Sequence, residues 1–230
     1  MKKLFTLFLA LLASSTLWAY KFQVDDLYYN VTSDTDQTVE VTFLGRYIQG
    51  QYYWEETYTN LTEVNIPSTI TYNETTYTVT SIGSMAFYRC SSLISINIPN
   101  TIKTIESHAF CDCSSLVSIK LPEHLSRIES STFQDCSSLS SISIPNSITS
   151  IGDWAFHGCS SLTSITIPNG VTNIGSSAFN WCHSLERTHY TGDITGWCNI
   201  EFGGPDANPI YYSNNLFINN QEIIDIIIPN

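Results

Sequence analysis

One repeat length governs most of this chain. Four hydrophobic residue types each recur every 23 residues through its middle. The four registers are Phe87, Phe110, Phe133, Phe156 and Phe179; Cys90, Cys113, Cys136, Cys159 and Cys182; Leu93, Leu116, Leu139, Leu162 and Leu185; and Ile82, Ile105, Ile128, Ile151 and Ile174. A fixed period of this length predicts a solenoid, in which each unit buries its apolar edge only against its neighbours.

The repeat unit predicts a strand followed by a turn. In residues 162–168, Ile165 and Ile167 alternate with hydroxyl residues, which indicates a strand with one buried face. Pro168 ends the strand because it has no N–H for the ladder. The Ser-Ser-Ala-Phe run ending at Phe179 then predicts a short helical turn on the opposite side. The residues placed to cap these turns are Ser84, Ser107, Ser130, Asp153 and Ser176.

A long motif carries a resemblance to a known family. The run Ile-Gly-x-x-Ala-Phe-x-x-Cys-Ser-Ser-Leu-x-Ser-Ile-x-Ile-Pro-Asn is nearly intact at 82–100 and 151–169, and looser at 105–123 and 128–146. It resembles the BspA-type bacterial leucine-rich repeat. The resemblance implies a leucine-rich-repeat solenoid, α/β leaning to mostly β, in an exported or surface-exposed protein that takes part in adhesion. It supplies no catalytic residues, and we expect a protein that is not an enzyme.

The expected organisation has four parts. Residues 1–19 read as a signal peptide for export, with Lys2 and Lys3 before an apolar run and Ala19 at the cleavage site. Residues 20–80 form a β-rich N-terminal cap with a first degenerate repeat, including a hairpin over 22–31 and a strand over 38–44. Residues 81–190 hold five repeats, with a parallel sheet on one face and the helical turns on the other.

The fourth part, residues 191–230, is expected to be irregular and to end in an incomplete repeat. The strand signature returns at 223–229, where the sequence stops. An uncovered apolar strand invites aggregation, which favours a truncated gene model or a fragment of a longer repeat protein. No later segment is apolar enough to cross a membrane, so we expect no transmembrane segment in the mature chain.

Seven cysteines in an exported chain invite a disulfide interpretation, but five of them lie in the repeat register. We expect those five to form an inward ladder of reduced thiols, because parallel Cβ vectors suit a disulfide poorly. Cys111 and Cys198 lie off the ladder and could be bridged or modified. Cys111 and Cys113 near His108 suggest a metal site, and Cys182 beside His183 suggests a catalytic pair. In each case the ladder cysteine, Cys113 or Cys182, should point inward. We therefore expect no metal, cofactor or catalytic residue.

The charge excludes one class of partner. The net charge is −12, and it becomes −14 without Lys2 and Lys3, when seven basic residues face twenty-one acidic ones. Proteins bind nucleic acids largely through Lys and Arg side chains, which displace the cations condensed on the phosphates. An acidic chain with few basic residues lacks this source of affinity. We therefore expect no nucleic-acid partner, and an extracellular protein or a cell-surface ligand instead.

Two surfaces are candidates for that partner. Each strand offers two outward positions, giving the columns Glu63, Ser95, Ser118, Ser141, Ser164, Arg187 and Asp225, and Asn65, Asn97, Lys120, Ser143, Thr166, His189 and Ile227. The second surface is an aromatic cluster in the cap, which can bury large rings at low entropy cost. The candidate binding residues are Tyr52, Tyr53, Trp54, Tyr58, Asn97, Lys120, Ser141, Ser143, Thr166, Arg187 and His189. The alternatives are a structural spacer in a longer surface protein and an accessory module that docks polysaccharide.

Overall fold

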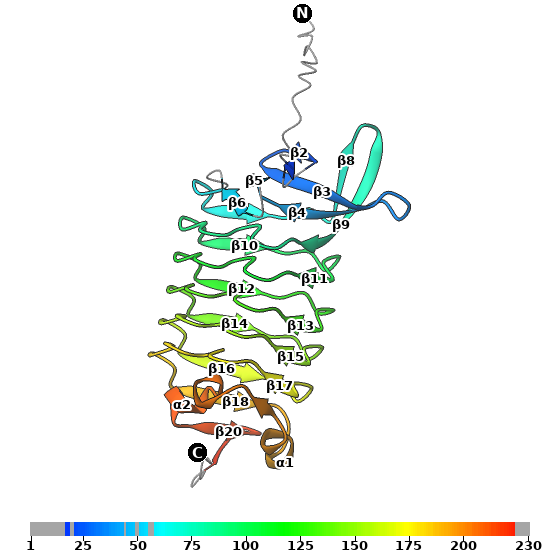
Figure 1. The fold of residues 1–230 in the computed structure, drawn as a ribbon. Helices are drawn as coiled ribbons and strands as arrows, with labels where there is room; N and C mark the ends of the chain where they lie inside the picture. Colours follow the sequence, from blue (N-terminus) through cyan, green and yellow to red (C-terminus); the bar gives the residue numbers. More distant parts are fainter. Residues whose placement is uncertain (1–16, 19–20, 44, 49–50, 55–57, 224–230) are drawn as a thin grey trace, which may run out of the picture.

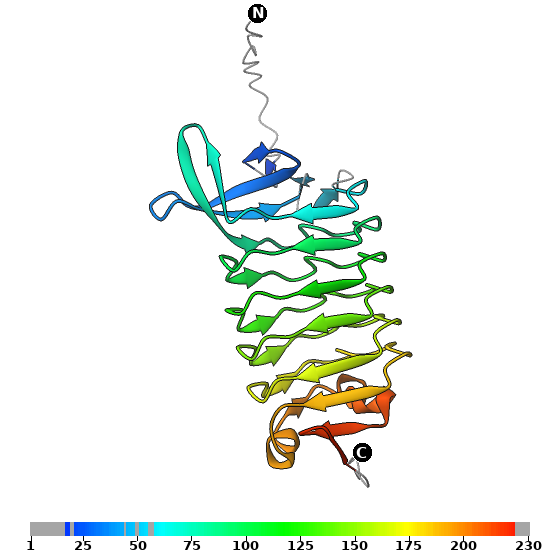
Figure 2. The same ribbon diagram turned by 180° about the vertical axis from the view of Figure 1, so that it is seen from behind.

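The structure is a computed structural model that describes residues 17–18, 21–43, 45–48, 51–54 and 58–223, with side chains described over 21–43 and 58–223. The described chain winds into a stack of coils with a β-rich cap on the first coil (Figures 1 and 2). Each coil has three sides, formed by a longer strand, a very short strand and a tight turn. The prediction of a mostly-β leucine-rich-repeat solenoid is confirmed.

The first side of every coil is the longer strand, and these strands stack in parallel along one side of the molecule (Figure 1). The stack consists of three hydrogen-bonded sheets in line, which together we call the long-strand sheet. Its strands are β7 (Glu63–Asn65), β10 (Ser95–Asn97), β12 (Ser118–Lys120), β14 (Ser141–Ser143), β16 (Ser164–Ile167), β18 (Arg187–Tyr190) and β20 (Leu216–Ile218). Ser164 of β16 lies beside Arg187 of β18, one repeat later. The central isoleucines, such as Ile119 and Ile165, point into the core, whereas the residues on either side face outward.

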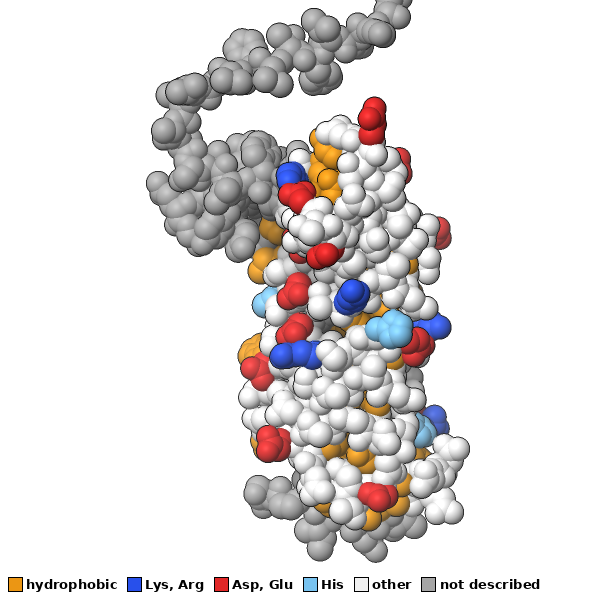
Figure 3. Space-filling view, turned by 90° about the vertical axis from the view of Figure 1, so that its right-hand side faces the viewer, with side chains coloured by type: hydrophobic (Ala, Val, Ile, Leu, Met, Phe, Trp, Pro, Cys, Tyr) orange, Lys and Arg blue, Asp and Glu red, His pale blue; other side chains and the backbone are white. Residues whose placement is uncertain are grey.

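A second stack of short parallel strands, divided between two sheets, occupies the return path of the coils. Its strands are the end of β9 (Thr75–Ile82), then β11 (Thr104–Ile105), β13 (Arg127–Ile128), β15 (Ser150–Ile151), β17 (Asn173–Ile174) and β19 (Glu201–Phe202). Figure 3 shows the molecule from this side. Backbone and uncharged polar side chains dominate the surface there, with scattered acidic, basic and histidine side chains and only small apolar patches. This side therefore offers no broad apolar contact surface.

The third side of the coils differs from the expected helical turns. Two residues per turn adopt a left-handed conformation, such as His108 and Asp112, with φ of 60° and 61°. The N–H groups alternate: that of Phe110 donates to Thr132 O in the next coil at 3.0 Å, whereas that of Cys111 donates to His108 O in its own coil at 3.1 Å. Half of the donors therefore join neighbouring coils, which a helical turn would not allow.

The predicted caps also work between coils. The Asp153 carboxylate accepts a hydrogen bond from the N–H of Ser176 at 2.7 Å, and the Ser84 hydroxyl donates to Ser107 O at 3.0 Å. These two side chains thus bond the residue one repeat later.

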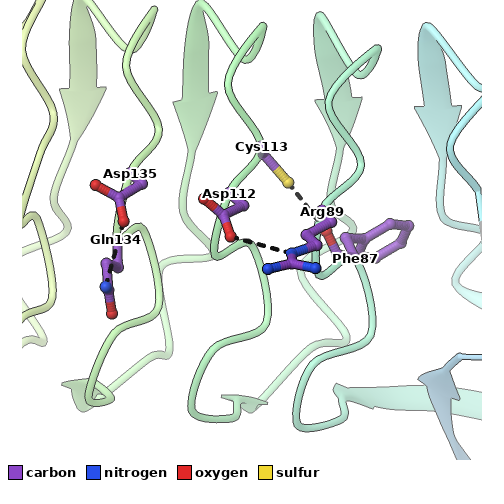
Figure 4. Close-up of polar contacts among 6 residues, drawn as sticks. All are labelled: Phe87, Arg89, Asp112, Cys113, Gln134 and Asp135. Carbon is purple, nitrogen blue, oxygen red and sulfur yellow. Dashed lines mark hydrogen bonds and ion pairs between the residues drawn. The ribbon is translucent and has the colours of Figure 1, made fainter. Parts of the chain in front are cut away.

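Two ladders of side chains fill the core. The rings of Phe87, Phe110, Phe133, Phe156 and Phe179 are fully buried and stack in sequence with centroids 5.3–5.6 Å apart. The five repeat cysteines are buried and reduced, as the register predicted. The thiol of Cys113 donates to Phe87 O at 3.1 Å (Figure 4), and the thiols of Cys136, Cys159 and Cys182 repeat that bond one coil further on. The thiols thus satisfy carbonyls at the corners of the turns.

The two remaining cysteines differ in access. Cys111 is buried, and burial together with Asp112 raises the pKa of its thiol to about 12, whereas Cys198 is exposed. We expect titration of the native chain with a thiol reagent to give one fast equivalent, from Cys198, since buried thiols with raised pKa values react slowly. Seven equivalents should appear in denaturant. Cys198→Ser should abolish the fast equivalent, and a second fast thiol would contradict the burial of Cys111.

The cap covers the first coil with antiparallel strands. The strands β2 (Phe22–Val24) and β3 (Leu27–Ser33) form a hairpin, β3 pairs with β4 (Thr38–Thr42), and β4 runs parallel to β9. The strand β8 (Thr69–Tyr72) forms a second hairpin with β9. A separate sheet joins β1 (Leu17–Trp18), β5 (Gly45–Ile48) and β6 (Gln51–Trp54). Most of the expected signal peptide lies outside the described residues.

The C-terminal part is another coil, although its sequence predicts irregular structure. It contains α1 (Ile194–Cys198), β19, the 3-10 helix η1 (Pro205–Ala207), α2 (Ile210–Ser213) and β20. Thr188 pairs with Leu216, so this coil is longer than a standard repeat. The strand β21 (Gln221–Ile223) then pairs antiparallel with β20, and the returning strand signature beyond Ile223 lies outside the described residues. Among the described residues, no helix has the length and apolar character needed to span a membrane.

Candidate functional site

The long-strand sheet gathers seven of the predicted binding residues on one outward surface. Asn97, Lys120, Ser143, Thr166 and His189 occupy one column, and the register pairs Lys120 with Ser143 and Thr166 with His189. The other two, Ser141 and Arg187, belong to the neighbouring column. His189 is half-buried and the other six side chains are exposed.

The first residues of the Asn97–His189 column already make polar contacts with other side chains of the chain. The Asn97 amide donates to the Asn65 side-chain oxygen at 2.6 Å, and Lys120 lies 3.9 Å from the Glu123 carboxylate. Both contacts are exposed, and an exposed ion pair contributes little energy. The serines between them carry short hydroxyls that bury little area. This stretch of the sheet is therefore a weak anchor for a partner.

The cap does not present Tyr58 as an exposed anchor. Only 8% of Tyr58 is exposed. Its hydroxyl donates to Thr42 O and accepts from the Tyr28 N–H, both at 2.7 Å, and its ring lies 5.2 Å from the ring of Phe87. Tyr58 thus ends the phenylalanine stack beneath the cap. The other predicted cap residues, Tyr52, Tyr53 and Trp54, lie in β6, and their side chains are outside the described residues.

The turn side of the first coils is polar. Arg89 Nε lies 3.5 Å from the Asp112 carboxylate one coil away (Figure 4). The Arg89 guanidinium also lies 5.1 Å from the ring centre of Tyr88. Asp135 is the next residue in the same column and accepts a bond from Gln134 at 3.3 Å. Cys111 and Cys113 do not converge on one point here, because the Cys113 thiol donates to Phe87 O in the core and Cys111 is buried in the turn.

The turn side of the later coils is aromatic, and sequence reasoning missed it. Six rings follow one another with neighbouring centroids between 4.7 and 6.4 Å apart. We call this surface the aromatic strip; its members are Trp154, His157, Trp181, His183, Tyr212 and Tyr211. Trp154, Trp181 and Tyr211 are 43%, 58% and 55% exposed, which is unusual for large rings.

The backbone under the strip is fixed by neighbouring coils. The Trp181 N–H donates to the Tyr212 hydroxyl at 3.0 Å, and that hydroxyl donates to the Asn180 side chain at 2.6 Å. The Trp154 N–H donates to Ser176 O at 2.9 Å. These bonds hold the rings in place before any partner arrives, which lowers the entropy cost of binding.

Packing does not explain why tryptophan stands at these positions. Trp154 and Trp181 both have positive φ, of 60° and 65°, a region that bulky residues rarely occupy. Serine fills the position of Trp154 in two other coils, as Ser131 and Ser177. The His157 Nδ1 atom is also buried without a hydrogen-bond partner among the described residues, which costs about 1–3 kcal/mol. The positive φ is common to all the turns, but the large exposed rings and the unsatisfied polar atom together mark this surface as a candidate functional site.

Aligning the repeats could have revealed the strip. The Trp154 position otherwise holds Met85, His108, Ser131 and Ser177, and the Trp181 position holds Arg89, Asp112, Asp135 and Gly158. Such variation between repeats indicates that the position is exposed. A tryptophan at an exposed position is unusual, and it is the sequence signal that points to a binding surface. The fold places His157 and His183 beside the tryptophans.

A hollow of about 530 Å³ lies on the long-strand sheet near its C-terminal end. The side chains of Thr166, His189 and Phe217 cross its floor from three adjacent strands, because each is in register with the next. The rings of His189 and Phe217 are stacked with centroids 5.0 Å apart. Two of the predicted binding residues, Thr166 and His189, therefore line this open hollow.

The geometry described so far defines a leucine-rich-repeat solenoid, and comparison with known proteins agrees. The family model for the BspA type leucine rich repeat region matches residues 80–206 in six copies, one more than the five repeats found in the sequence. That match covers more than half of the chain, so the chain belongs to the BspA-type leucine-rich-repeat family. No curated protein matches it significantly.

Two solved structures are similar to most of the chain. A leucine-rich repeat protein from Bacteroides ovatus has 33% identity and a TM-score of 0.61 over 74% of this chain and 47% of its own. The T. pallidum leucine-rich repeat protein has 30% identity and a TM-score of 0.60 over 74% of this chain and 71% of its own. The chain therefore spans about half the length of the first relative.

Proposed function

We propose that the chain is an exported binding module that holds an extracellular protein, with the aromatic strip supplying most of the binding energy. The observation that carries this proposal is the row of preformed, exposed rings on the turn side of the later coils. Tryptophan and tyrosine dominate the energetic centres of protein interfaces because they bury large areas at little cost in side-chain entropy. Membership of a repeat family whose stacked units offer extended surfaces supports the same function.

The charge of the molecule supports a protein partner over a nucleic acid or an anionic membrane. The net charge of the chain is −12. Two of its acidic residues, Asp112 and Asp135, occupy the repeat position of Trp181 in earlier coils. A partner with a neutral or basic surface would approach faster than an acidic one. Export through residues 1–19 belongs to the same proposal, and its product should begin at Tyr20 when its N-terminus is read by mass spectrometry.

A paired substitution tests the aromatic strip. Trp154→Ser with Trp181→Asn should weaken binding at least about 30-fold, because two hot-spot rings each contribute about 1–2 kcal/mol or more. Serine already stands at the first position in other coils, and asparagine tolerates positive φ, so the fold should be preserved. The measurement is the Kd for any partner found in a panel of extracellular matrix and bacterial surface proteins.

The matched control lies on the long-strand sheet. Ser118→Ala with Ser141→Ala removes two exposed hydroxyls from neighbouring strands and should change Kd less than about threefold. A Trp54→Ala variant tests the cap as a second anchor. Thermal melting must match the wild type in every variant. Dominance of the serine pair, or no partner anywhere in the panel, would remove the support for this function.

The structural spacer is the rival function. A spacer needs coils of fixed spacing but no exposed rings, so the exposed tryptophans would have no purpose in it. The aromatic strip therefore favours the binding module.

A further inference from the structure

We propose that the aromatic strip holds its partner by an arginine side chain, which lies against the Trp181 ring and pairs with the Asp135 carboxylate. This inference rests on the proposed function, because it names the chemical group that the same strip recognises. The place for the arginine is in a row of residues 23 apart that we call the turn column. Its members are Arg89, Asp112, Asp135, Gly158 and Trp181.

The first coil shows how this surface holds an arginine of its own. Arg89 Nε lies 3.5 Å from the carboxylate of Asp112, the next member of the turn column (Figure 4). The guanidinium also lies 5.1 Å from the ring centre of Tyr88. An aromatic ring, an arginine and a carboxylate therefore meet on adjacent coils, with a cation–π contact and an ion pair made by one guanidinium.

Three coils later the ring position is kept but the arginine is missing. His157 stands at the repeat position of Tyr88, and Gly158 stands at that of Arg89. The ring of Trp181, one coil further on, has its centroid 6.4 Å from that of His157 and is 58% exposed. Because glycine has no side chain, a group from outside can approach these two rings where Arg89 would stand.

The carboxylate of Asp135 lies at the same place. Its Oδ1 atom is the atom nearest to the position that a Cβ at Gly158 would take. The Asp135 N–H donates to His157 O at 2.7 Å, which fixes the residue beside that coil. Asp135 Oδ2 accepts from Gln134 at 3.3 Å, whereas no hydrogen bond to Oδ1 occurs within the described residues. Oδ1 is therefore the oxygen that can accept from a partner's guanidinium.

The charge around the strip favours a cationic group. From residue 128 to residue 230 the sequence has nine acidic residues and one basic residue, a balance of 1 − 9 = −8. The basic residue, Arg187, lies in the long-strand sheet and not on the turn side. The strip thus offers rings and negative charge without a cation of its own, which attracts cations and repels anions.

Arginine fits this site better than lysine. A planar guanidinium can stack on an indole while its N–H groups donate to a carboxylate, whereas a lysine ammonium is a compact and strongly hydrated point charge. The site is partly exposed, so salt should screen the ion pair and weaken the binding.

The test titrates the chain at low salt with the peptide acetyl-Gly-Arg-Gly-Arg-Gly-amide and with versions that carry citrulline or lysine in place of both arginines. NMR of the tryptophan indole N–H groups follows binding, with the Trp181 signal assigned from Trp181→Asn. We expect the arginine peptide to bind with Kd of about 1 mM or tighter. The citrulline peptide, which keeps the shape but lacks the charge, should bind at least about tenfold more weakly, and the lysine peptide about threefold more weakly.

Two substitutions in the turn column form a matched pair. Asp135→Asn removes the charge beside Gly158 and should weaken binding of the arginine peptide at least about fivefold. Asp112→Asn is the control, because that carboxylate already pairs with Arg89, and it should leave Kd unchanged. Gly158→Arg should block the peptide; Arg89 has a φ of 60° at the same repeat position, so the turn accepts arginine. Both aspartate variants should melt with the wild type.

The results also separate this inference from the proposed function. A panel protein whose binding needs the Trp154 and Trp181 rings but not Asp135 would refute the arginine site and leave the binding module standing. Peptide binding with no partner in the panel would do the reverse. No shift of the Trp181 signal at about 10 mM peptide, equal binding of the citrulline or the lysine peptide, or equal Kd for the wild type and Asp135→Asn would overturn the proposal.

Discussion

Replacing Phe133 by alanine is expected to lower the free energy of unfolding by about 3–5 kcal/mol. Phe133 is fully buried, and its ring centroid lies 5.6 Å from those of both Phe110 and Phe156. Removal of the ring opens a cavity between two coils that other hydrogen bonds hold at a fixed separation, so the site cannot collapse to fill it. Urea unfolding followed by circular dichroism measures the loss.

The position of Phe133 also predicts a change in cooperativity. Each coil of a solenoid contacts only its neighbours, so weakening the middle contact lets the two halves unfold separately. The transition should broaden and its urea dependence should fall. Ser143→Ala is the matched control, because that side chain is exposed on the long-strand sheet and should change stability by less than about 0.5 kcal/mol. Equal, small effects of both substitutions would show that the assignment of the core is wrong.

The second large effect is a loss of stability in alkali. Burial raises the pKa of the Cys182 thiol from its ordinary value of 9.0 to about 12, and it raises the pKa values of the Cys113 and Cys159 thiols well above that ordinary value. A thiol whose pKa is higher in the folded chain ionises first in the unfolded chain. Its contribution to stability is therefore complete below pH 9 and is lost as the pH rises toward 12.

The loss of stability in alkali is the sum of the contributions of several thiols. For a thiol like that of Cys182, the linkage relation gives a loss of about 2–3 kcal/mol at pH 11, and several ladder thiols act together. We expect urea unfolding at pH 8, 9, 10 and 11 to show stability falling steeply above pH 9. The buried phenol of Tyr58, whose pKa burial also raises, adds to the fall above pH 10.

Substitution of the ladder separates the thiols from the phenols. Cys159→Ala lowers stability at pH 7 by opening a small cavity, but it should flatten the decline above pH 9, because one titrating group has gone. Cys198→Ala, at the exposed cysteine, is the control and should leave the pH profile unchanged. A profile that stays flat to pH 11 in the wild type would mean that the ladder thiols are not buried as described.

The sequence predicts most of the fold because the repeat is regular. Phenylalanine, cysteine, leucine and isoleucine at one spacing predict the buried registers, and all four registers are buried. The alternation at Ile165 and Ile167 predicts the strand, and the N-terminal hairpin at β2 and β3 has a clear turn at Asp25. In each case, local pattern and burial agree.

Other parts depend on contacts between coils, which a single repeat does not display. The Ser-Ser-Ala-Phe run predicts a helical turn by local preference, but bonds such as that from the Phe156 N–H to Ala178 O in the next coil hold it open. The C-terminal coil was missed because its inserted helix breaks the period. The aromatic strip joins residues from separate coils and from α2, so their proximity follows from stacking and not from spacing in the chain.

The backbone N–H groups on the turn side, which donate alternately within a coil and to the next coil, help to set the length of the stack. Hydrogen bonds join each coil to the next on the turn side, and parallel strand pairs join many of them on the other two sides. Neighbouring coils therefore advance by about the same step, about 4.8 Å, as strands in any sheet. A gain or loss of one 23-residue unit would move the cap by one such step relative to the aromatic strip and leave every column aligned. The separation between the two ends of the stack is thus counted in whole coils, and it can change in evolution or by design without any new packing arrangement.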